Sequence, residues 1–296
     1  MSFGASFLHN PDLFPARPAG EPWGDRELVL DLPGGPYRFA GLSAEQVEAA
    51  LDRFGDLRLE GDGIVTTTLF RAAAEGFREI DTRGWEYGME MDPGPTSVRL
   101  AGMDLLGRLD WRPDLRGTLW TPVAGGERFP GIFENFCRVL VAYRLHEIGG
   151  AVIHGAAVVD GDDAFLFAGP SGAGKSTVSR MALESGRTVL SDDLNALLPG
   201  PILAGLPFTG DLERGDRGQF PLRALFRLEK DVDDRLLPMS RAQTAACLMA
   251  CSPFVNADHH RHGALLSNLL DLTAGVPSRA LRFSLTGRMW SILREA

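Results

Sequence analysis

Short alternations of apolar and polar residues dominate the first part of the chain and predict β-strands. Segments 28–32 and 37–40 flank Pro33-Gly34-Gly35-Pro36, a pattern typical of a hairpin. Ser43-Ala44-Glu45-Gln46 resembles a capping box and predicts a helix that runs to about residue 54. Further strand-like segments occur at residues 57–59, 64–70, 78–81, 97–100, 105–111 and 118–122. We therefore expect a β-rich module with an antiparallel sheet over residues 25–128, preceded by an irregular proline-containing arm at residues 1–24.

The hydrophobic period changes in the second part of the chain. Apolar residues recur at three- and four-residue steps over 129–149, which predicts an amphipathic helix ended by Gly149-Gly150. Asp160-Gly161 separates two apolar segments, 151–159 and 164–168, and this is a strong hairpin pattern. Helices are then predicted at 174–184, 240–249, 263–272 and 287–294, and strands at 187–190, 222–228 and 279–283. This mixture predicts an α/β domain over residues 129–296.

The stretch Gly169-Pro170-Ser171-Gly172-Ala173-Gly174-Lys175-Ser176 carries the most specific motif. It fits the phosphate-binding pattern G-x-x-x-x-G-K-[S/T], and it lies between a predicted strand and a predicted helix, as that pattern requires. Its glycines permit backbone conformations that turn successive N–H groups toward one anion. The helix start adds positive charge, Lys175 adds a mobile cation, and the Ser176 hydroxyl is a ligand for Mg²⁺. We expect a nucleotide phosphate site that extends to Thr177.

Two features flank this loop at distances that suit catalysis. Asp192-Asp193 follows the next predicted strand, and strand ends converge on the crevice where ligands bind. One carboxylate would hold Mg²⁺ and the other would accept a proton from an attacking hydroxyl, and the pattern leaves the assignment open. A solvated turn is the alternative, which the position after the loop disfavours. His154 lies on a strand expected to run antiparallel to the one before the loop, so a place near the phosphates and a buried core histidine are equally good interpretations.

Three other groups of residues also have two interpretations. The loop 209–218 contains Glu213-Arg214 and Arg217, which would either close on a bound Mg-nucleotide or lie exposed. The run 258–262 contains three histidines, but adjacent histidines rarely face one ion, so we favour a polar helix start over a metal site. Cys247 and Cys251 share a helix face, and without a second cysteine pair we favour small buried residues over zinc ligands.

Composition narrows the classes of partner. The 296 residues carry a formal charge of -9, whereas nucleic-acid contacts need clustered Lys and Arg, so no nucleic-acid partner is expected. The hydrophobic content of 44% and charged content of 23% are ordinary for a globular protein. The first ten residues lack the pattern of a secretion signal, and no apolar run approaches the roughly 18–20 residues of a membrane span. We expect a reduced, cytoplasmic protein without membrane association.

The motifs around the loop resemble a known family. His154-Gly155, the loop 169–176 and Asp192-Asp193 are similar to the His-Gly, P-loop and paired-Asp core of bacterial HPr kinase/phosphorylase, which is related to the ATP-dependent phosphoenolpyruvate carboxykinases. More closely, the chain resembles stand-alone HPr-kinase-related proteins of peptide-modification gene clusters, including the lasso-peptide precursor kinases. The resemblance covers about residues 130–230. It implies an α/β fold with a P-loop nucleotide-binding domain of the HPr kinase/PEP carboxykinase type at 129–296, next to the β-rich module.

The resemblance implies a role for each motif. Lys175 and Ser176 would bind the phosphates of ATP and Mg²⁺. Asp192 would act as the general base on a serine hydroxyl, and Asp193 would assist or bind the metal. His154 would contact the transferred phosphate.

Two departures from the family pattern concern the metal and the acceptor. The family's Glu-x-Arg-Gly signature supplies a Mg²⁺-binding Glu, and its nearest match, Glu213-Arg214-Gly215, is one residue short. Thr177 stands where the HPr enzymes carry Glu, and their C-terminal docking signature has no match. HPr itself is therefore disfavoured as the acceptor, and we expect a homo-oligomer smaller than the hexamers of the HPr enzymes.

The expected function is that of an ATP- and Mg²⁺-dependent serine kinase acting on a peptide or small protein. Two alternatives stay open: a kinase for a small-molecule hydroxyl, and a nucleotide-dependent binding module without kinase activity. A transporter-type ATPase is disfavoured because the chain lacks Leu-Ser-Gly-Gly-Gln. A nucleoside kinase is disfavoured because its loop would lie near the start of the chain, whereas 168 residues precede this one.

Overall fold

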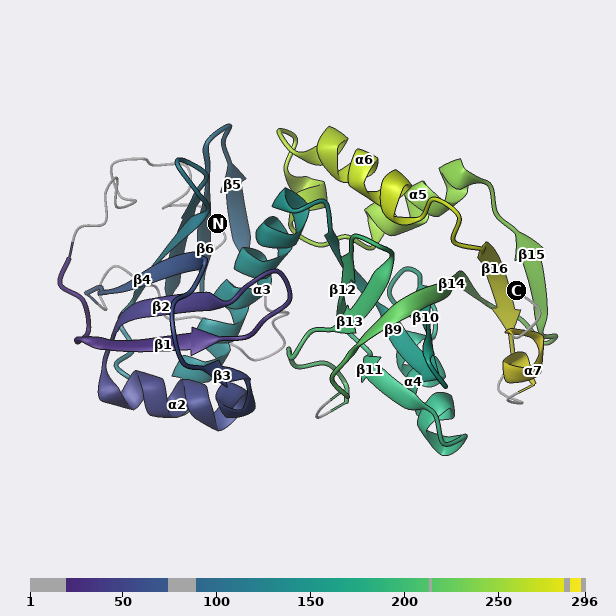
Figure 1. The fold of residues 1–296 in the computed structure, drawn as a ribbon, viewed down its shortest axis with the longest axis horizontal. Helices are drawn as coiled ribbons and strands as arrows, with labels where there is room; N and C mark the ends of the chain where they lie inside the picture. Colours follow the sequence, from purple (N-terminus) through teal and green to yellow (C-terminus); the bar gives the residue numbers. More distant parts are fainter. Residues whose placement is uncertain (1–19, 74–88, 213–214, 285–287, 294–296) are drawn as a thin grey trace. The chain divides into compact units, whose positions relative to one another are not determined.

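The computed structural model describes residues 20–73, 89–212, 215–284 and 288–293. The chain divides into two compact units, Met1–Arg144 and Leu145–Ala296 (Figure 1). The sequence pattern predicts that the second domain begins at residue 129, which is the first residue of helix α3 (Phe129–Glu147). The structure instead groups most of that helix with the first unit. Nearly all of the arm expected at 1–24, and the strand expected at 78–81, lie outside the described residues.

The described part of the first unit is built on one eight-stranded sheet, with the strand order β3-β1-β2-β4-β8-β7-β6-β5. Its strands are β1 (Arg26–Leu30), β2 (Tyr37–Leu42), β3 (Arg58–Leu59), β4 (Val65–Arg71), β5 (Glu90–Pro93), β6 (Ser97–Gly102), β7 (Leu105–Asp110) and β8 (Arg116–Thr121). Strands β1 and β2 form the expected hairpin. The expectation of an antiparallel sheet is wrong, because the pairs β2–β4 and β4–β8 are parallel.

Helix α2 (Ala44–Phe54) explains the first parallel pair. It begins at the predicted capping box, in which the Gln46 N–H donates to the Ser43 hydroxyl and the Ser43 N–H donates to the Gln46 side chain. The helix and the short 3-10 helix η1 (Gly55–Leu57) separate β2 from β4 along the chain. A crossover of this length lets two neighbouring strands run in the same direction.

Helix α3 supplies much of the core of the first unit. Phe129, Phe133 and Phe136 recur along one side of the helix and are fully buried. The Phe136 ring lies so close to Gly107 and Gly117 that a Cβ on either glycine would approach it within 3.1 and 2.9 Å. Glycine at these two sheet positions therefore allows the close approach of the aromatic row.

The described part of the second unit contains another eight-stranded sheet. Its strands are β9 (Ala151–Asp160), β10 (Asp163–Ala168), β11 (Thr188–Ser191), β12 (Leu194–Leu198), β13 (Ile202–Gly205), β14 (Gln219–Lys230), β15 (Arg235–Pro238) and β16 (Ser278–Phe283). The pairings β10-β9-β12-β13-β14 form a ring, because β14 also pairs in parallel with β10. Strands β16 and β15 extend the sheet from β14, and β11 pairs with β9. The predicted β9–β10 hairpin is confirmed.

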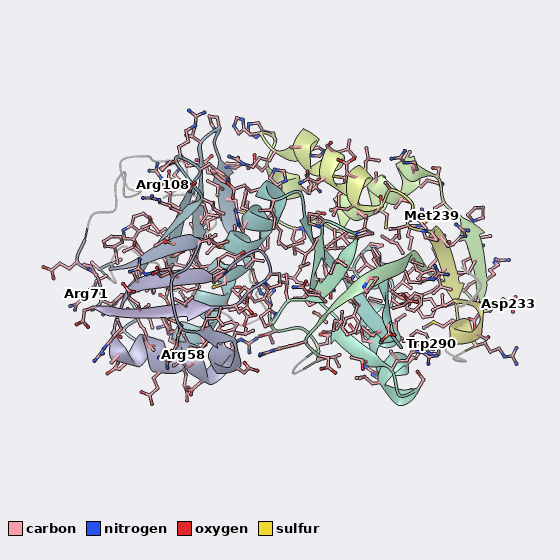
Figure 2. The ribbon with its side chains drawn as sticks, in the orientation of Figure 1. Arg58, Arg71, Arg108, Asp233, Met239 and Trp290 are labelled. Atoms are coloured by element: carbon pink, nitrogen blue, oxygen red, sulfur yellow. The ribbon has the colours of Figure 1, made fainter. Side chains whose placement is uncertain are left out.

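The α-helices of the second unit agree with the sequence prediction. They are α4 (Lys175–Glu184), α5 (Arg241–Ala250), α6 (His262–Leu272) and α7 (Met289–Leu293), and the short 3-10 helix η3 (Val255–Ala257) was not predicted. Val178 and Ala182 of α4 belong to the same buried cluster as Phe167 of β10 and Phe226 of β14. Trp290 of α7, labelled in Figure 2, lies edge-on to Phe167 with ring centroids 6.1 Å apart. This cluster fixes α4, and with it the loop that precedes α4, against the sheet.

Both units combine helices with large mixed sheets, so the protein is of the α/β class. Among the residues that the structure describes, no helix combines the length and the apolar character that crossing a bilayer demands.

His146 makes the stability of the second unit depend on pH. Burial lowers the pKa of His146, the positive charge of Arg261 lowers it further, and Asp258 acts in the opposite direction. The unfolded chain therefore binds a proton that the folded chain resists, and the free energy of unfolding falls as pH decreases below about 6.5. We expect His146→Gln to lose less stability than the wild type between about pH 7 and pH 5, as measured by urea unfolding. The matched change at the exposed His259 should leave the pH dependence as it is in the wild type.

Candidate functional site

A cavity of about 600 Å³ lies within the second unit, where β10 ends and α4 begins. Six residues of the glycine-rich loop and the first turn of α4 line it, namely Ser171, Gly172, Gly174, Lys175, Ser176 and Thr177. The other lining residues are His154, Asp192, Asp193, Thr209, Gly210, Asp211 and Lys230. The structure therefore brings together most of the site residues expected from the sequence. Gly169, Pro170 and Ala173 belong to the loop but do not line the cavity.

The loop has the backbone conformation that its glycines make accessible. Gly172 and Gly174 have φ values of +76° and +110°, in the left-handed region that favours glycine. Gly174 is also the N-cap of α4, without a side-chain cap. A Cβ at this position would lie 2.7 Å from the ring of Phe283 in β16. Only glycine fits there, and the uncapped helix start faces the cavity with the N–H groups that every helix leaves without an intrahelical partner.

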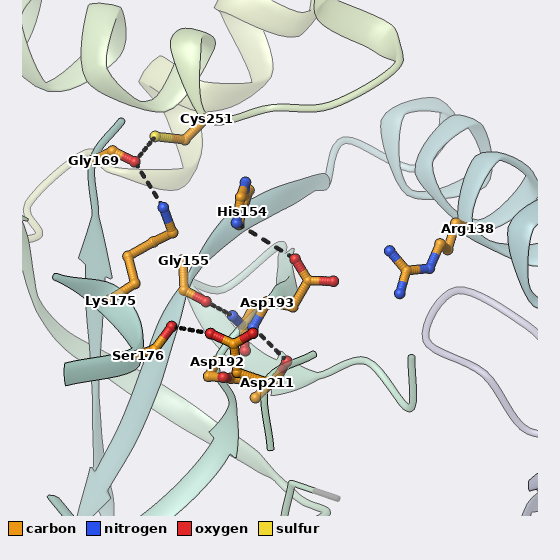
Figure 3. Close-up of polar contacts among 12 residues, drawn as sticks. Arg138, His154, Gly155, Gly169, Lys175, Ser176, Asp192, Asp193, Asp211 and Cys251 are labelled. Atoms are coloured by element: carbon orange, nitrogen blue, oxygen red, sulfur yellow. Dashed lines mark hydrogen bonds and ion pairs between the residues drawn. The ribbon is translucent and has the colours of Figure 1, made fainter. Parts of the chain in front are cut away.

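Lys175 is folded back onto the loop, as Figure 3 shows. Its Nζ donates to the carbonyl oxygens of Gly169 at 3.2 Å and Pro170 at 3.3 Å, and the residue is only 8% exposed. The thiol of Cys251 also lies 3.6 Å from the Gly169 carbonyl. The ammonium group thus has neutral partners that a phosphate oxygen would replace with a stronger, charge-assisted hydrogen bond.

The segment from Thr209 to Leu212 connects the loop with the Asp pair. The Ser176 hydroxyl donates to Asp211 Oδ2 at 2.5 Å, and the backbone N–H of Leu212 donates to Asp192 Oδ1 at 3.4 Å (Figure 3). A Cβ on Gly210 would lie 2.3 Å from Asp192 Oδ1, so this segment passes directly over the carboxylate. This segment therefore contacts both Ser176, at the start of α4, and Asp192.

Asp192 is the most unusual charged group of the cavity. It is 5% exposed, and its Oδ2 is buried without a hydrogen-bond partner among the described residues. Burial raises the pKa of Asp192, the Leu212 N–H acts in the opposite direction, and the carboxylates of Asp211 and Asp193 raise it further. A buried carboxylate oxygen without a donor needs a proton, a cation or a donor from a ligand. A raised pKa also makes the carboxylate a stronger proton acceptor.

His154 and Asp193 form a second polar pair in the cavity. The His154 Nε2 lies 3.4 Å from Asp193 Oδ1. Backbone pairing sets this arrangement, because His154 is opposite Leu194 in the β9–β12 register and the Gly155 N–H donates to the Asp193 carbonyl at 2.9 Å. The side chain of His154 is 45% exposed, so of the two interpretations, a place at the cavity is observed and a buried core position is not.

The other candidates from the sequence are not among the residues that the structure places at the cavity. Glu213 and Arg214 fall outside the described residues, and Arg217 is exposed and does not line the cavity. His262 is the first residue of α6, after the buried Asp258 that accepts hydrogen bonds from Arg261 and from the backbone of His260. Among the residues described by the structure, no cluster of three or more His, Cys, Asp or Glu side chains is placed to hold a metal.

The two cysteines of α5 and its C-terminal cap lie behind the loop. A hydrogen bond from Cys247 lowers the pKa of the Cys251 thiol, although burial acts in the opposite direction. Cys251 is buried, and its carbonyl accepts the backbone N–H of His154 at 2.7 Å. Cys251 thus contacts both the strand that carries His154 and the loop, as a small buried residue does.

Two charged lining residues, Asp211 and Lys230, are not expected from the sequence, and neither are Thr209 and Gly210. The loop 209–218 has a pattern of Glu and Arg residues, but no local pattern distinguishes Asp211 from an acid in a solvated turn. Lys230 ends β14, the strand that the sequence predicted only to residue 228. Their positions depend on pairings between distant strands, which no local pattern contains.

The fold and the cavity define an α/β protein whose second unit holds a polar cavity at a glycine-rich loop. A family model described as SynChlorMet cassette protein ScmC matches residues 133–296, and the chain therefore belongs to this family. The match includes the whole second unit and every residue that lines the cavity. A search of the curated proteins found no match.

The position of Gly210 over the Asp pair gives a stability prediction. We expect Gly210→Ala to lower the free energy of unfolding by about 1–3 kcal/mol, the usual cost of forcing extra atoms into a packed site. Gly263 of α6 is the matched control, because a Cβ there meets no atom within 4 Å. Gly263→Ala should preserve or raise stability by up to about 1 kcal/mol, since Ala is the better helix former. Equal stabilities in urea unfolding would show that the 209–212 segment does not pack on Asp192 as described.

Proposed function

We propose that the protein is an ATP- and Mg²⁺-dependent phosphotransferase that moves the γ-phosphoryl group of ATP to a hydroxyl, with a serine of a peptide or small protein as acceptor. One observation supports this proposal more strongly than the others. A buried carboxylate with an unpartnered oxygen, on Asp192, shares a cavity with a glycine-rich loop that has a lysine and an uncapped helix start. The first group suits proton removal, and the second suits a phosphate donor.

Donor binding would use the loop and α4. The N–H groups at the start of the helix would donate to the β- and γ-phosphate oxygens. Lys175 would exchange its hydrogen bonds to two loop carbonyls for bonds to these oxygens. We also propose a more specific fold for the second unit, namely a nucleotide-binding domain of the HPr kinase/PEP carboxykinase type. The His-Gly, loop and paired-Asp motifs described above support this assignment.

The oxygen groups of the cavity fit Mg²⁺ that arrives with the nucleotide. This ion usually takes one or two carboxylates and completes its shell with phosphate oxygens and water. Ser176 and Asp211 are joined by a hydrogen bond, and Asp193 lines the same cavity. We propose that these three residues hold the ion, with Asp211 supplying the acid that the signature around Glu213 supplies in the family. When bound, Mg²⁺ would neutralise charge on the phosphate oxygens.

Transfer would then need a base and an in-line acceptor. Asp192 would take the proton of the serine hydroxyl while the serine oxygen bonds to the γ-phosphorus and the bond to the β–γ bridging oxygen breaks, which leaves ADP. His154, beside Asp193, would donate a hydrogen bond to the phosphoryl group as it moves. The chain's own contribution would be mainly positioning and charge compensation.

The base role of Asp192 gives the decisive test. We expect Asp192→Asn to reduce phosphate transfer by at least about 100-fold, because an amide cannot accept the proton. ATP affinity, measured separately with a fluorescent nucleotide, should change little. The substrates would be γ-labelled ATP and the peptides encoded beside the gene, and the readout would be label on serine.

The controls separate the alternatives. Asp216→Asn removes an exposed acid outside the cavity and should keep full activity. Transfer to a small hydroxyl compound but to no peptide would favour the small-molecule kinase. If the wild type binds ATP yet labels no hydroxyl, the kinase proposal fails and a nucleotide-dependent binding module remains.

The metal role of Asp211 can be tested without turnover. We expect Asp211→Asn to raise the Mg²⁺ concentration needed for tight ATP binding by about 10–100-fold, the usual cost of losing a group that holds or orients a metal. ATP affinity in EDTA should stay close to that of the wild type. Glu213→Gln is the comparison, and a larger effect there than at Asp211 would assign the acid to the family position instead.

A further inference from the structure

Lysine is almost absent from this chain. Of its 30 lysine and arginine residues only two are lysines, Lys175 and Lys230, and both line the cavity. Arginine serves the other cationic positions, such as Arg58, Arg71 and Arg108 in Figure 2. Lysine differs from arginine in carrying a compact point charge on a flexible stem. The presence of both lysines in one cavity therefore indicates that this cavity needs flexible point charges, and not only general surface charge.

The strand geometry explains how Lys230 reaches the loop. Phe226 and Leu228 of β14 belong to the buried cluster that includes Val178 of α4. Side chains two residues apart on a strand share a face, so Lys230 continues this row at the end of the strand, on the α4 side. In the register of β14 with β16, Lys230 is opposite Phe283, whose ring also contacts the Gly174 position. Lys230 thus lies beside the start of α4.

The ammonium group of Lys230 is available for a ligand. Its chain neighbours are acids that pair with arginines, Glu229 with Arg227 and Arg282, and Asp231 with Arg235. Within the described residues the Nζ of Lys230 forms no hydrogen bond or ion pair, and the residue is exposed to the cavity. An independent sign of a ligand is the buried and unpartnered Oδ2 of Asp192 in the same cavity.

The order of the strands separates two sides of the cavity. Strand β10, which leads into the loop, has β9 on one side and β14 on the other. His154 belongs to β9 and contacts Asp193, so the β9 side holds the histidine proposed to contact the transferred phosphoryl group and an acid proposed to bind the metal. Lys230 lies on the β14 side, away from them. A cation on the β14 side suits the α- and β-phosphates of the donor nucleotide, which are not transferred.

We propose that Lys230 is a second phosphate-binding residue, which holds the α- and β-phosphates of the donor nucleotide from the β14 side of the loop. This rests on the proposed nucleotide site but not on phosphate transfer, because ADP carries both phosphate groups. Lys175 and Lys230 then flank the phosphate chain, and the acids on the β9 side face the group to be transferred.

The test is equilibrium binding of ADP and ATP to the full chain, by displacement of a fluorescent nucleotide. We expect Lys230→Gln to weaken both nucleotides about tenfold or more, as for other hydrogen bonds to a charged group. Lys230→Arg keeps the charge and should recover part of the affinity, which also guards against a variant that fails to fold. Arg223→Gln removes an exposed cation from the same strand outside the cavity and should have no effect.

Each other result overturns the proposal in a distinct way. If Lys230→Gln binds ADP and ATP like the wild type, Lys230 has no role in donor binding. A loss for ATP alone would move the contact to the γ-phosphate, and a raised KM for the acceptor peptide alone would move Lys230 to the acceptor. Failure of the wild type to bind either nucleotide would remove the proposed function together with this role.

Discussion

The pairing register of strand β9 determines which side chains meet in the cavity. Gly155 is opposite Ala168 on β10, one residue before the glycine-rich loop, and His154 is opposite Leu194 on β12, directly after Asp193. A slip of one residue would turn every β9 side chain to the opposite face and move His154 away from Asp193. The side chain of Asn195 adds to this register by donating to the Gly155 carbonyl at 2.7 Å. The loop, the histidine and the acid pair are thus parts of one hydrogen-bonded arrangement.

The polar groups of the cavity partly satisfy one another. Ser176 bonds to Asp211, Lys175 bonds to loop carbonyls, and His154 faces Asp193. A ligand would therefore exchange existing hydrogen bonds for its own rather than bury groups that were fully solvated. Such exchange has a small net free energy per bond, so selectivity would come from the charged groups. Asp192 and Lys230 are exceptions, because the Asp192 Oδ2 and the Lys230 Nζ have no partner among the described residues to give up when a ligand binds.

Local patterns predicted the elements of the second unit better than their arrangement. The hairpin turn, the loop and the helices carry their signals in neighbouring residues, and the structure contains each of them. Strands β12, β13 and β15 were not predicted; each has only four or five residues, and β12 and β13 flank a Pro-Gly-Pro turn. The parallel pairs of the first unit were missed although helix α2 was predicted between β2 and β4. The position of Asp211 in the cavity depends on long-range strand pairing, which no local pattern contains. For Lys230 the sequence did hold an indication, because lysine is scarce in its composition.

The contact between Gly174 and Phe283 has a consequence for how the protein is made. The two residues lie 109 positions apart in the sequence, and the aromatic ring of the later one packs against the backbone of the earlier one. During synthesis, α4 and its loop leave the ribosome long before β16 exists, so the loop has no wall on that side until nearly the whole second unit has been translated. Contacts of such large sequence separation form late, because closing the intervening chain costs entropy first. The cavity would therefore be completed as one of the last events of folding, and a nascent chain would hold an exposed, unfinished loop until then.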